Sequence, residues 1–397
     1  MKHLVTLMVL AACGESTPPL APLRTSEDAP ALDALRAANF DEAVRLSTQQ
    51  LAIEPRDAEA AAIRAIANYV KASSTMFVAM DAGHSWFWFD KAFEPNAPPM
   101  INLFVDQLGV IDRDLAVAGA DPRFSLELCL ACWSFDWNHD GKIDQRDTQL
   151  FELDEDTKGK IPEGDPRRHP TFRFDVGDVS WARAMVSFQR AVGELLLAYR
   201  WSDATKHKDE NGESPDPLVI HLIAPERVKH ARELVLAGLE LSDQSRLQYL
   251  AETDDDREWV PNPKQKSYAM PLPVDVKLYA TWAGVVGDVR GLVAGRTGVS
   301  MRELAMLEGH KLSAITPDAY VDLGRMLTEP TDIVIPTHEE GEDVASMTRI
   351  LRGVLGHGYN EHMTSSPLVH RLAAMRDDLE KGSDTLDHKL HYLFWIN

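Results

Sequence analysis

The sequence predicts an all-α protein. Its apolar residues repeat at helical spacing; in one long stretch, for example, Trp181, Met185 and Phe188 recur at three- and four-residue intervals. Hydrophobic residues make up 44% of the 397 residues, which is enough to bury a substantial core. No set of segments alternates apolar and polar residues as half-buried strands do, although 218–223 and 333–335 are candidates for short strands.

The N-terminus has the pattern of a signal segment. Lys2 supplies a positive charge, and the apolar run after it is too short to span a bilayer and ends in Leu-Ala-Ala-Cys. This ending resembles a bacterial lipobox, which implies that Cys13 becomes a lipidated N-terminus. Gly14 follows, and by the sorting rule of such lipoproteins this implies an anchor in the outer membrane. An apolar N-terminus with an incidental Cys is the alternative.

The formal net charge is −21 at pH 7. Nucleic-acid recognition needs a basic surface, so this acidic balance excludes nucleic acid as the expected partner. It suits a protein in surroundings rich in calcium.

Two cysteines remain once Cys13 is assigned to lipid. Cys129 and Cys132 have CxxC spacing, but no strand is expected before them and no second ligand pair follows, which disfavours a thioredoxin-like or zinc site. Trp133 stands where haem attachment requires a His. We expect two buried free cysteines on a helix, with a local disulfide as the alternative.

A helical hairpin is expected near the N-terminus. Asn39 begins a helix that ends at Pro55, and Asp57 caps the Ala-rich helix that follows. The small residues Ala43 and Ala65, together with the terminating Pro, resemble packing positions of tetratricopeptide repeats. The resemblance implies a protein partner bound through these helices as the alternative; we favour a purely structural hairpin.

Residues 136–147 carry the clearest chemical signal. In the sequence DWNHDGKIDQRD, oxygen-bearing side chains stand at places 1, 3, 5, 9 and 12, and Gly141 stands at place 6. This is the ligand spacing of a calcium loop, in which the cation takes six to eight oxygens at about 2.3–2.6 Å. Ile143, at place 8, is expected to face the apolar core. The expected ligands are the side chains of Asp136, Asn138, Asp140, Asp144 and Asp147 and the main-chain carbonyl of Lys142.

This loop resembles those of the EF-hand family, most closely the extracellular bacterial branch with dockerin-type loops. The resemblance covers about 30 of the 397 residues and implies a helix on each side of the loop. Asp147 stands where calcium sensors usually have Glu. The shorter Asp side chain weakens calcium binding and leaves Mg²⁺ as an alternative to Ca²⁺. An acidic turn that binds no ion is the other interpretation. The apolar face of the expected entering helix consists of Phe124, Leu128, Cys132 and Phe135.

A second loop of this kind is not expected. The stretch that begins at Asp154 mimics the spacing, but Lys158 and Pro162 occupy two of its ligand places. We interpret it as an acidic connector, with a degenerate second site as the alternative. The expected order along the chain is a signal segment with lipobox (1–13), a flexible tether (14–30), a repeat-like hairpin (31–72), a helical segment with the calcium loop (73–153), an acidic connector (154–172) and a C-terminal α-helical domain (173–397).

The C-terminal domain shows helical periodicity and many histidines, but no HExxH motif, nucleophile elbow or phosphate loop. Helices are expected at 179–199, 224–250, 273–295, 299–308, 317–328, 342–356, 366–380 and 384–395. The histidines are His338, His357, His362, His370, His388 and His391. We expect them to be separate side chains and not a metal site.

These patterns together predict a calcium-binding, lipid-anchored protein of the bacterial envelope, with a structural ion and no enzymatic activity. The first alternative is a scaffold or adhesion protein that binds an envelope partner through the repeat-like helices. The second is an envelope hydrolase whose site lies in the C-terminal domain and uses His357 or His362.

Overall fold

The computed structural model describes most of the chain. The described residues are 30–81, 97–144, 147, 151–156, 159–204, 217–255, 257–266, 268, 274–308, 314–336 and 343–379. Some sequence predictions lie outside them: the signal segment with Cys13, most of the tether, Lys158, His338, His388, His391 and the helix expected at 384–395.

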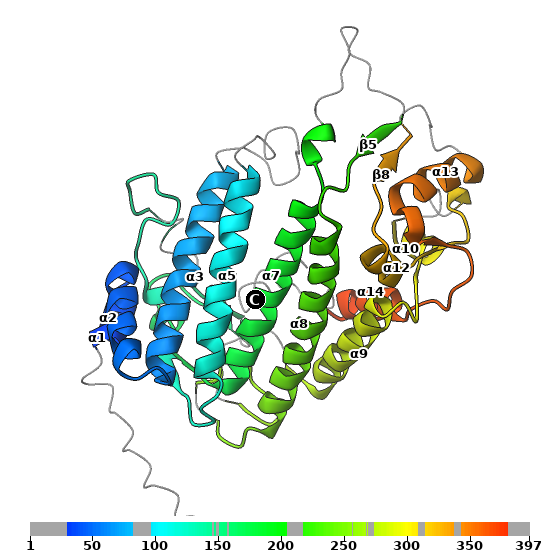
Figure 1. Cartoon of the computed structure of the whole chain (residues 1–397). Coiled ribbons are helices and arrows are strands. Elements are labelled where there is room, and N and C mark those ends of the chain that lie inside the picture. Colours follow the sequence, from blue (N-terminus) through cyan, green and yellow to red (C-terminus); the bar gives the residue numbers. More distant parts are fainter. Residues whose placement is uncertain are drawn as a thin grey trace, which may run out of the picture.

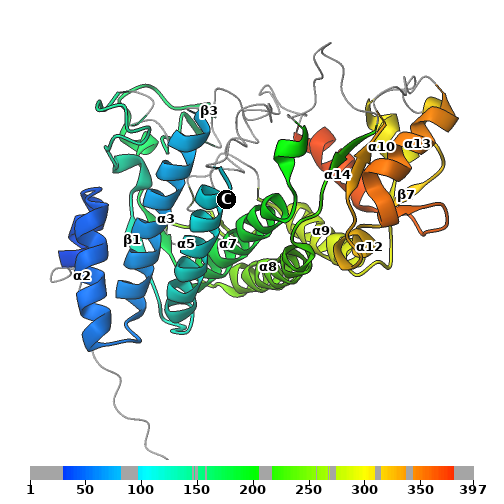
Figure 2. The ribbon, with the colours of Figure 1, turned by 45° about the horizontal axis from the view of Figure 1, so that its top comes forward.

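A row of helices forms most of the molecule, and helices that are neighbours in sequence are neighbours in space (Figure 1). In order they are α1 (Pro30–Arg36), α2 (Phe40–Ile53), α3 (Ala58–Asp81), α5 (Ala97–Ala118), α7 (Val176–Ala198), α8 (Pro225–Ala251) and α9 (Val276–Val293). Short helices follow at the far end of the row (Figure 2): α10 (Met301–Glu308), α12 (Leu323–Thr328), α13 (Val344–Leu355) and α14 (Leu368–Leu379).

Side chains at the helix ends explain where these helices begin. Asn39 accepts a hydrogen bond from the main-chain N–H of Glu42 at the start of α2, and Asp57 accepts one from Ala60 at the start of α3. Such caps satisfy N–H groups that have no partner inside the helix. The predicted hairpin is therefore present, with the predicted residues at its turns.

The described residues also form small sheets, so the fold is mostly helical and not strictly all-α. Each sheet is antiparallel and has two or three strands. The strands are β1 (Leu126–Leu128) with β4 (Phe172–Phe174), β2 (Glu155–Asp156) with β3 (Gly159–Lys160), β5 (Leu218–Ile220) with β8 (Ile333–Ile335), and β6 (Val299–Ser300) with β7 (Tyr320–Val321) and β9 (Tyr359–Asn360). The pair β5–β8 confirms both candidate strands of the sequence.

The helix expected at 317–328 is shorter than predicted. Tyr320 and Val321 pair with neighbouring strands, and helix α12 begins only after Asp322, whose carboxylate accepts the N–H of Arg325. The cap and the strand pairing fix a boundary that apolar periodicity does not reveal.

The largest core lies between α1, α2, α3, α5, α7 and strand β1. Polar contacts tie its helices together at the edges. Arg64 of α3 donates two hydrogen bonds, of 2.8 and 2.6 Å, to Asp114 of α5, and Arg183 of α7 donates one of 2.8 Å to Asp112. Asp114 is 5% exposed, so this carboxylate depends on Arg64 for its charge partner.

Candidate functional site

The segment before the acidic loop is not the predicted helix. Residues 126–128 form strand β1, which pairs with β4, and a single 3₁₀ turn, η2 (Leu130–Cys132), follows. Strand pairing satisfies the main-chain groups of this segment with residues 44 to 48 positions away, from Leu128 with Phe172 to Leu126 with Phe174. Phe124 and Leu128 are buried as predicted, but Cys132 is exposed. Residues 148–150, where an exiting helix would begin, lie outside the described part.

The first half of the loop is closed by its own side chains. The two carboxylate oxygens of Asp136 accept the N–H groups of Asp140 (3.1 Å) and Gly141 (2.8 Å). Asn138 Oδ1 also accepts the N–H of Asp140 at 3.0 Å, and Asp140 Oδ1 accepts that of Lys142 at 3.0 Å. The side chains at places 1, 3 and 5 therefore turn toward the same stretch of main chain.

Asp147 joins the two ends of the loop. Its Oδ1 accepts the N–H of Trp137 at 3.0 Å, and its Oδ2 accepts the N–H of Asp144 at 2.9 Å. The residue is 3% exposed although it is acidic. These bonds satisfy two main-chain donors and compensate for burial of the carboxylate.

The turn at the centre of the loop requires two left-handed residues. Gly141 has φ 84°, which confirms that the sixth place needs a Gly. His139 has φ 55°, and its Nε2 lies 3.0 Å from Ser74 Oγ of α3. Ser74 Oγ donates to the carbonyl of Trp137 at 2.5 Å, so α3 holds the loop in place. The sequence carries no local sign of this Ser74 contact.

Ile143 contradicts its prediction. It is 54% exposed and does not face the core. Hydrogen bonds from main-chain N–H groups to Asp136 and Asp147 close the loop, so its turn does not require an apolar anchor at the eighth place. Lys142 is also exposed. This is compatible with its expected role, because only its main-chain carbonyl would bind the ion.

The donor set suits a hard cation, although its carboxylates are not gathered around one point. Among the described residues, no group of three or more His, Cys, Asp or Glu side chains is arranged to hold a metal ion. The carboxylates are instead bonded to N–H groups of the loop. The expected ligand set is mixed, because it adds the amide of Asn138 and the carbonyl of Lys142, and all of its ligands are oxygens, as Ca²⁺ and Mg²⁺ require.

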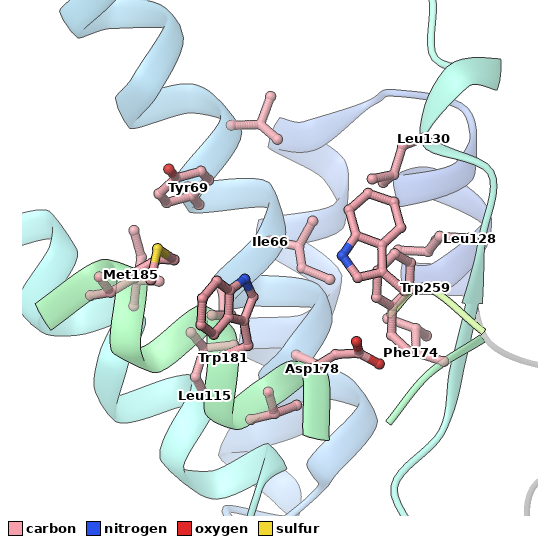
Figure 3. Close-up of a pocket in the computed structure, with 18 of the residues that line it drawn as sticks. Ile66, Tyr69, Leu115, Leu128, Leu130, Phe174, Asp178, Trp181, Met185 and Trp259 are labelled. Carbon is pink, nitrogen blue, oxygen red and sulfur yellow. The ribbon is translucent and has the colours of Figure 1, made fainter. Parts of the chain in front are cut away.

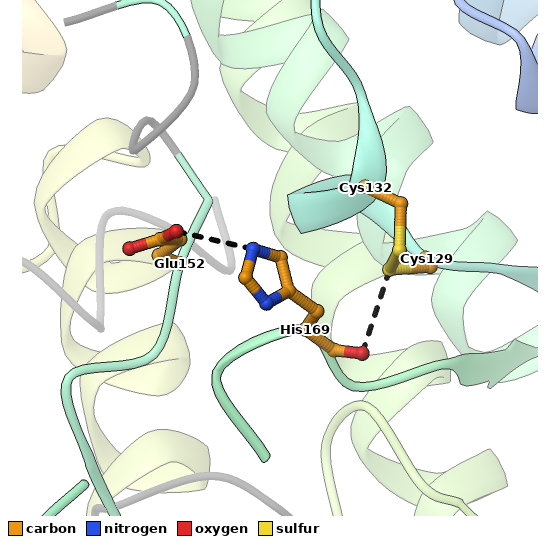
Figure 4. Close-up of a disulfide and its surroundings, with 4 residues drawn as sticks. All are labelled: Cys129, Cys132, Glu152 and His169. Atoms are coloured by element: carbon orange, nitrogen blue, oxygen red, sulfur yellow. Dashed lines mark hydrogen bonds and ion pairs between the residues drawn. A yellow bond between two sulfur atoms is a disulfide. The ribbon is translucent and has the colours of Figure 1, made fainter. Parts of the chain in front are cut away.

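The two cysteines before the loop form a disulfide, Cys129–Cys132 (Figure 4). The expectation of two free buried cysteines was wrong, as was the absence of a strand before them, because β1 ends at Leu128. The 3₁₀ turn brings the two Cα atoms to 5.3 Å, within the range that a disulfide spans. No helix continues from η2, so the context is not that of a thioredoxin-like site.

Glu152 fastens the chain beside the disulfide (Figure 4). Its carboxylate lies 3.0 Å from Arg168 Nη2 and 3.1 Å from His169 Nε2. The carbonyl oxygen of His169 lies 3.5 Å from Cys129 Sγ. The segments before and after the loop are thus held against residues 166–169.

A buried acidic group that the sequence did not suggest lies at the start of α7 and the end of α8. Asp178 Oδ1 accepts a 2.7 Å hydrogen bond from the Tyr249 hydroxyl, and its Oδ2 accepts the N–H of Asp175. Burial, followed by the charge of Asp175, raises the pKa of Asp178 well above its usual range. Burial and the nearby Asp175 and Glu258 raise the pKa of Glu252 to about 9. These residues come from distant segments, so no local motif reveals them.

The described histidines of the C-terminal part lie apart from such a group. His357 Nδ1 lies 3.2 Å from the carbonyl oxygen of Glu329, and His370 Nε2 lies 3.6 Å from a carboxylate oxygen of Glu303. His357, His362 and His370 are all exposed. Within the described residues their arrangement gives no support to a catalytic pocket around His357 or His362.

Comparison with known proteins identifies no relative: no family model matches the chain, and neither a curated protein nor a solved structure is similar to it. None of the described helices is long and apolar enough to cross a membrane.

Proposed function

We propose that this protein binds one calcium ion in the loop at 136–147 and that the ion is structural. The observation that carries the proposal is a pair of hydrogen bonds that the Asp136 carboxylate accepts from the N–H groups of Asp140 and Gly141. Gly141 has a left-handed backbone conformation at this turn. This closure gives the loop a tight turn at the place where a calcium loop needs one. An all-oxygen set of four carboxylates and one amide surrounds that turn in sequence.

A structural role follows from what the loop touches. Trp137, at its second place, packs edge-on against Phe135 with ring centroids 5.6 Å apart, and Phe135 packs against Phe40 of α2 at 4.9 Å. An ion that fixes the loop would therefore fix an aromatic contact between the loop and the helical row. Any ligand that binds only the folded state stabilises it, by about 2.7 kcal/mol at 100 times its Kd.

We expect the affinity to be modest. Both oxygens of Asp147 already accept main-chain N–H groups, so this carboxylate has fewer lone pairs left than the bidentate Glu of a calcium sensor. Mg²⁺ is then a competitor, because the preference for calcium depends on ligand number and on a large, flexible site.

The lipid anchor at Cys13 completes the proposal. The apolar run that ends in Leu-Ala-Ala-Cys supports a lipid anchor, and Gly14 after the Cys supports a place in the bacterial outer membrane. The acidic body suits the calcium-rich outside of a cell. Mass spectrometry of the mature N-terminus tests this part: diacylglycerol on Cys13, lost with Cys13→Ala, is the expected result. An unmodified N-terminus upstream of Cys13 in the native host would contradict it.

Calorimetric titration with Ca²⁺ tests the ion site. We expect one site per chain in the wild type and none in Asp136→Ala or Asp140→Ala. Asp33→Ala is the matched control, because it removes the same charge from α1, where the side chain is 68% exposed and outside the loop. Equal calcium uptake by the wild type and both loop variants would rule out the proposal.

A further inference from the structure

A cavity of about 520 Å³ lies between α3, α5, α7 and the β1–β4 ribbon (Figure 3). Apolar and aromatic side chains line it from all of these elements, among them Ile66, Leu115, Leu128, Phe174, Trp181 and Met185. Protein interiors are packed as densely as organic crystals, with few voids larger than a water molecule. This hollow borders the largest core and is partly open to the surface, and an open apolar hollow of this size commonly marks a binding site.

The volume identifies the kind of occupant. Pockets for small molecules measure about 300–1,000 Å³. The volume of this cavity lies within that range, so it fits a single small molecule.

The described lining offers no partner to an anionic ligand. No Lys, Arg or His is among the described residues that line the cavity, so none of them supplies a counter-charge. Asp178 lines it, but both of its oxygens are occupied, by the Tyr249 hydroxyl and the N–H of Asp175. Burial also raises the pKa of Asp178 well above its usual range, which disfavours its charged form.

Contacts outside the cavity fix the positions of the helices that form its walls. The Arg64–Asp114 pair ties α3 to α5, and Arg183–Asp112 ties α7 to α5. On the side of the loop, Ser74 of α3 donates to the carbonyl of Trp137, another lining residue. A cavity fixed in this way is preformed, which lowers the cost of ordering that binding must overcome.

We propose that this cavity binds one uncharged, mostly hydrocarbon small molecule, such as a neutral acyl lipid or a polycyclic compound. The site borders the calcium loop through Trp137, but its lining contains none of the expected calcium ligands, so the proposal does not require an ion to be bound there. Four tryptophans are among its lining residues, Trp133, Trp137, Trp181 and Trp259, so a ligand that absorbs near their emission reports its own binding.

Titration with Nile red, an uncharged hydrophobic dye, tests the proposal. The full chain carries Cys13→Ala, so that attached lipid does not compete for the dye. We expect saturable binding at one site per chain, seen as an increase and a blue shift of the dye's own emission. Ala182→Phe, which places a ring in the cavity from α7, is expected to weaken binding about ten-fold or more. Val192→Phe on the same helix, where Val192 is 57% exposed and outside the lining, is the matched control and is expected to bind as the wild type does.

Ser73→Phe fills the cavity from the opposite helix, α3, and serves as a second test if Ala182→Phe does not fold. Absence of saturable binding would overturn the proposal. A cavity already filled by another part of this chain would give the same result and would overturn it equally. So would equal affinity in the folded cavity variants and Val192→Phe. Tighter binding of the anionic dye anilinonaphthalene sulfonate than of Nile red would overturn the uncharged class of ligand.

Discussion

The main-chain N–H of Trp137 donates a 3.0 Å hydrogen bond to Oδ1 of Asp147, and this bond joins the second place of the acidic loop to its last. Trp137 also lines the apolar cavity, and Asp147 is buried. The closure of the loop is thus coupled to the position of a core aromatic side chain, whether or not an ion is bound.

Asp147→Ala is expected to destabilise the protein in calcium-free buffer by about 1–3 kcal/mol, because it leaves two main-chain donors without their acceptor. Urea denaturation in the presence of a chelator measures the change. Ile143→Ala is the control within the same loop: this side chain is 54% exposed, so a change within about 0.5 kcal/mol is expected. Equal stability of the two variants would show that Asp147 acts only through an ion.

Reduction of the Cys129–Cys132 disulfide should cost about 2 kcal/mol, because so short a loop removes little entropy from the unfolded chain. Urea denaturation with and without a reductant measures this. The double variant Cys129→Ser/Cys132→Ser should match the reduced wild type and be insensitive to reductant. If the intact mass of the protein did not increase by two hydrogens on reduction, the disulfide would be absent in solution.

Local patterns predicted the long helices well. Apolar spacing and end signals together define α7, α8 and α9, and both candidate strands pair as β5 and β8. Each of these signals lies within the element that it predicts. The prediction of Gly141 at the sixth place of the loop is also local, because the positive φ of this residue is what requires a Gly.

Long-range pairing was not predictable from the same patterns. The apolar residues from Phe124 to Phe135 fit a helix, yet three residues of that stretch pair with β4, 44 to 48 positions further along. CxxC spacing is compatible with free thiols as well as with a disulfide. The spacing alone does not predict the 3₁₀ turn that brings the two cysteines within disulfide distance. The predicted direction of Ile143 assumed an apolar neighbour that the described residues do not supply.

Asp114→Ala is expected to destabilise the protein by about 3–5 kcal/mol, because it leaves Arg64 without its partner between α3 and α5. The value should fall at the low end, since the Arg64 side chain is 25% exposed and can reach water. Glu42→Ala, which breaks an exposed ion pair with Arg45 on α2, should cost much less, because water and salt screen an exposed pair. Chemical denaturation of both variants provides the comparison, and similar losses would mean that the Arg64–Asp114 pair contributes no more than a surface contact.

The buried acids Asp178 and Glu252 predict that stability falls as pH rises. The pKa of each is raised in the folded protein, to about 9 for Glu252, whereas the unfolded chain has ordinary values of 3.8 for Asp and 4.5 for Glu. Between about pH 4.5 and 9 the folded state therefore binds more protons than the unfolded state, and the free energy of unfolding decreases with pH. The melting temperature should be higher at pH 5.5 than at pH 8.5, apart from the effect of any bound ion, which a chelator removes.

Glu252→Gln isolates one of these groups, because the amide keeps the shape of the side chain and cannot ionise. We expect the melting temperature of this variant to fall less steeply with pH than that of the wild type, and to exceed it at pH 8.5. The control is Glu226→Gln in the exposed first turn of the same helix, α8, which should keep the wild-type slope. Parallel curves for the wild type and Glu252→Gln, measured by circular dichroism, would mean that Glu252 is ionised in the folded protein and that water or a cation reaches the acidic group.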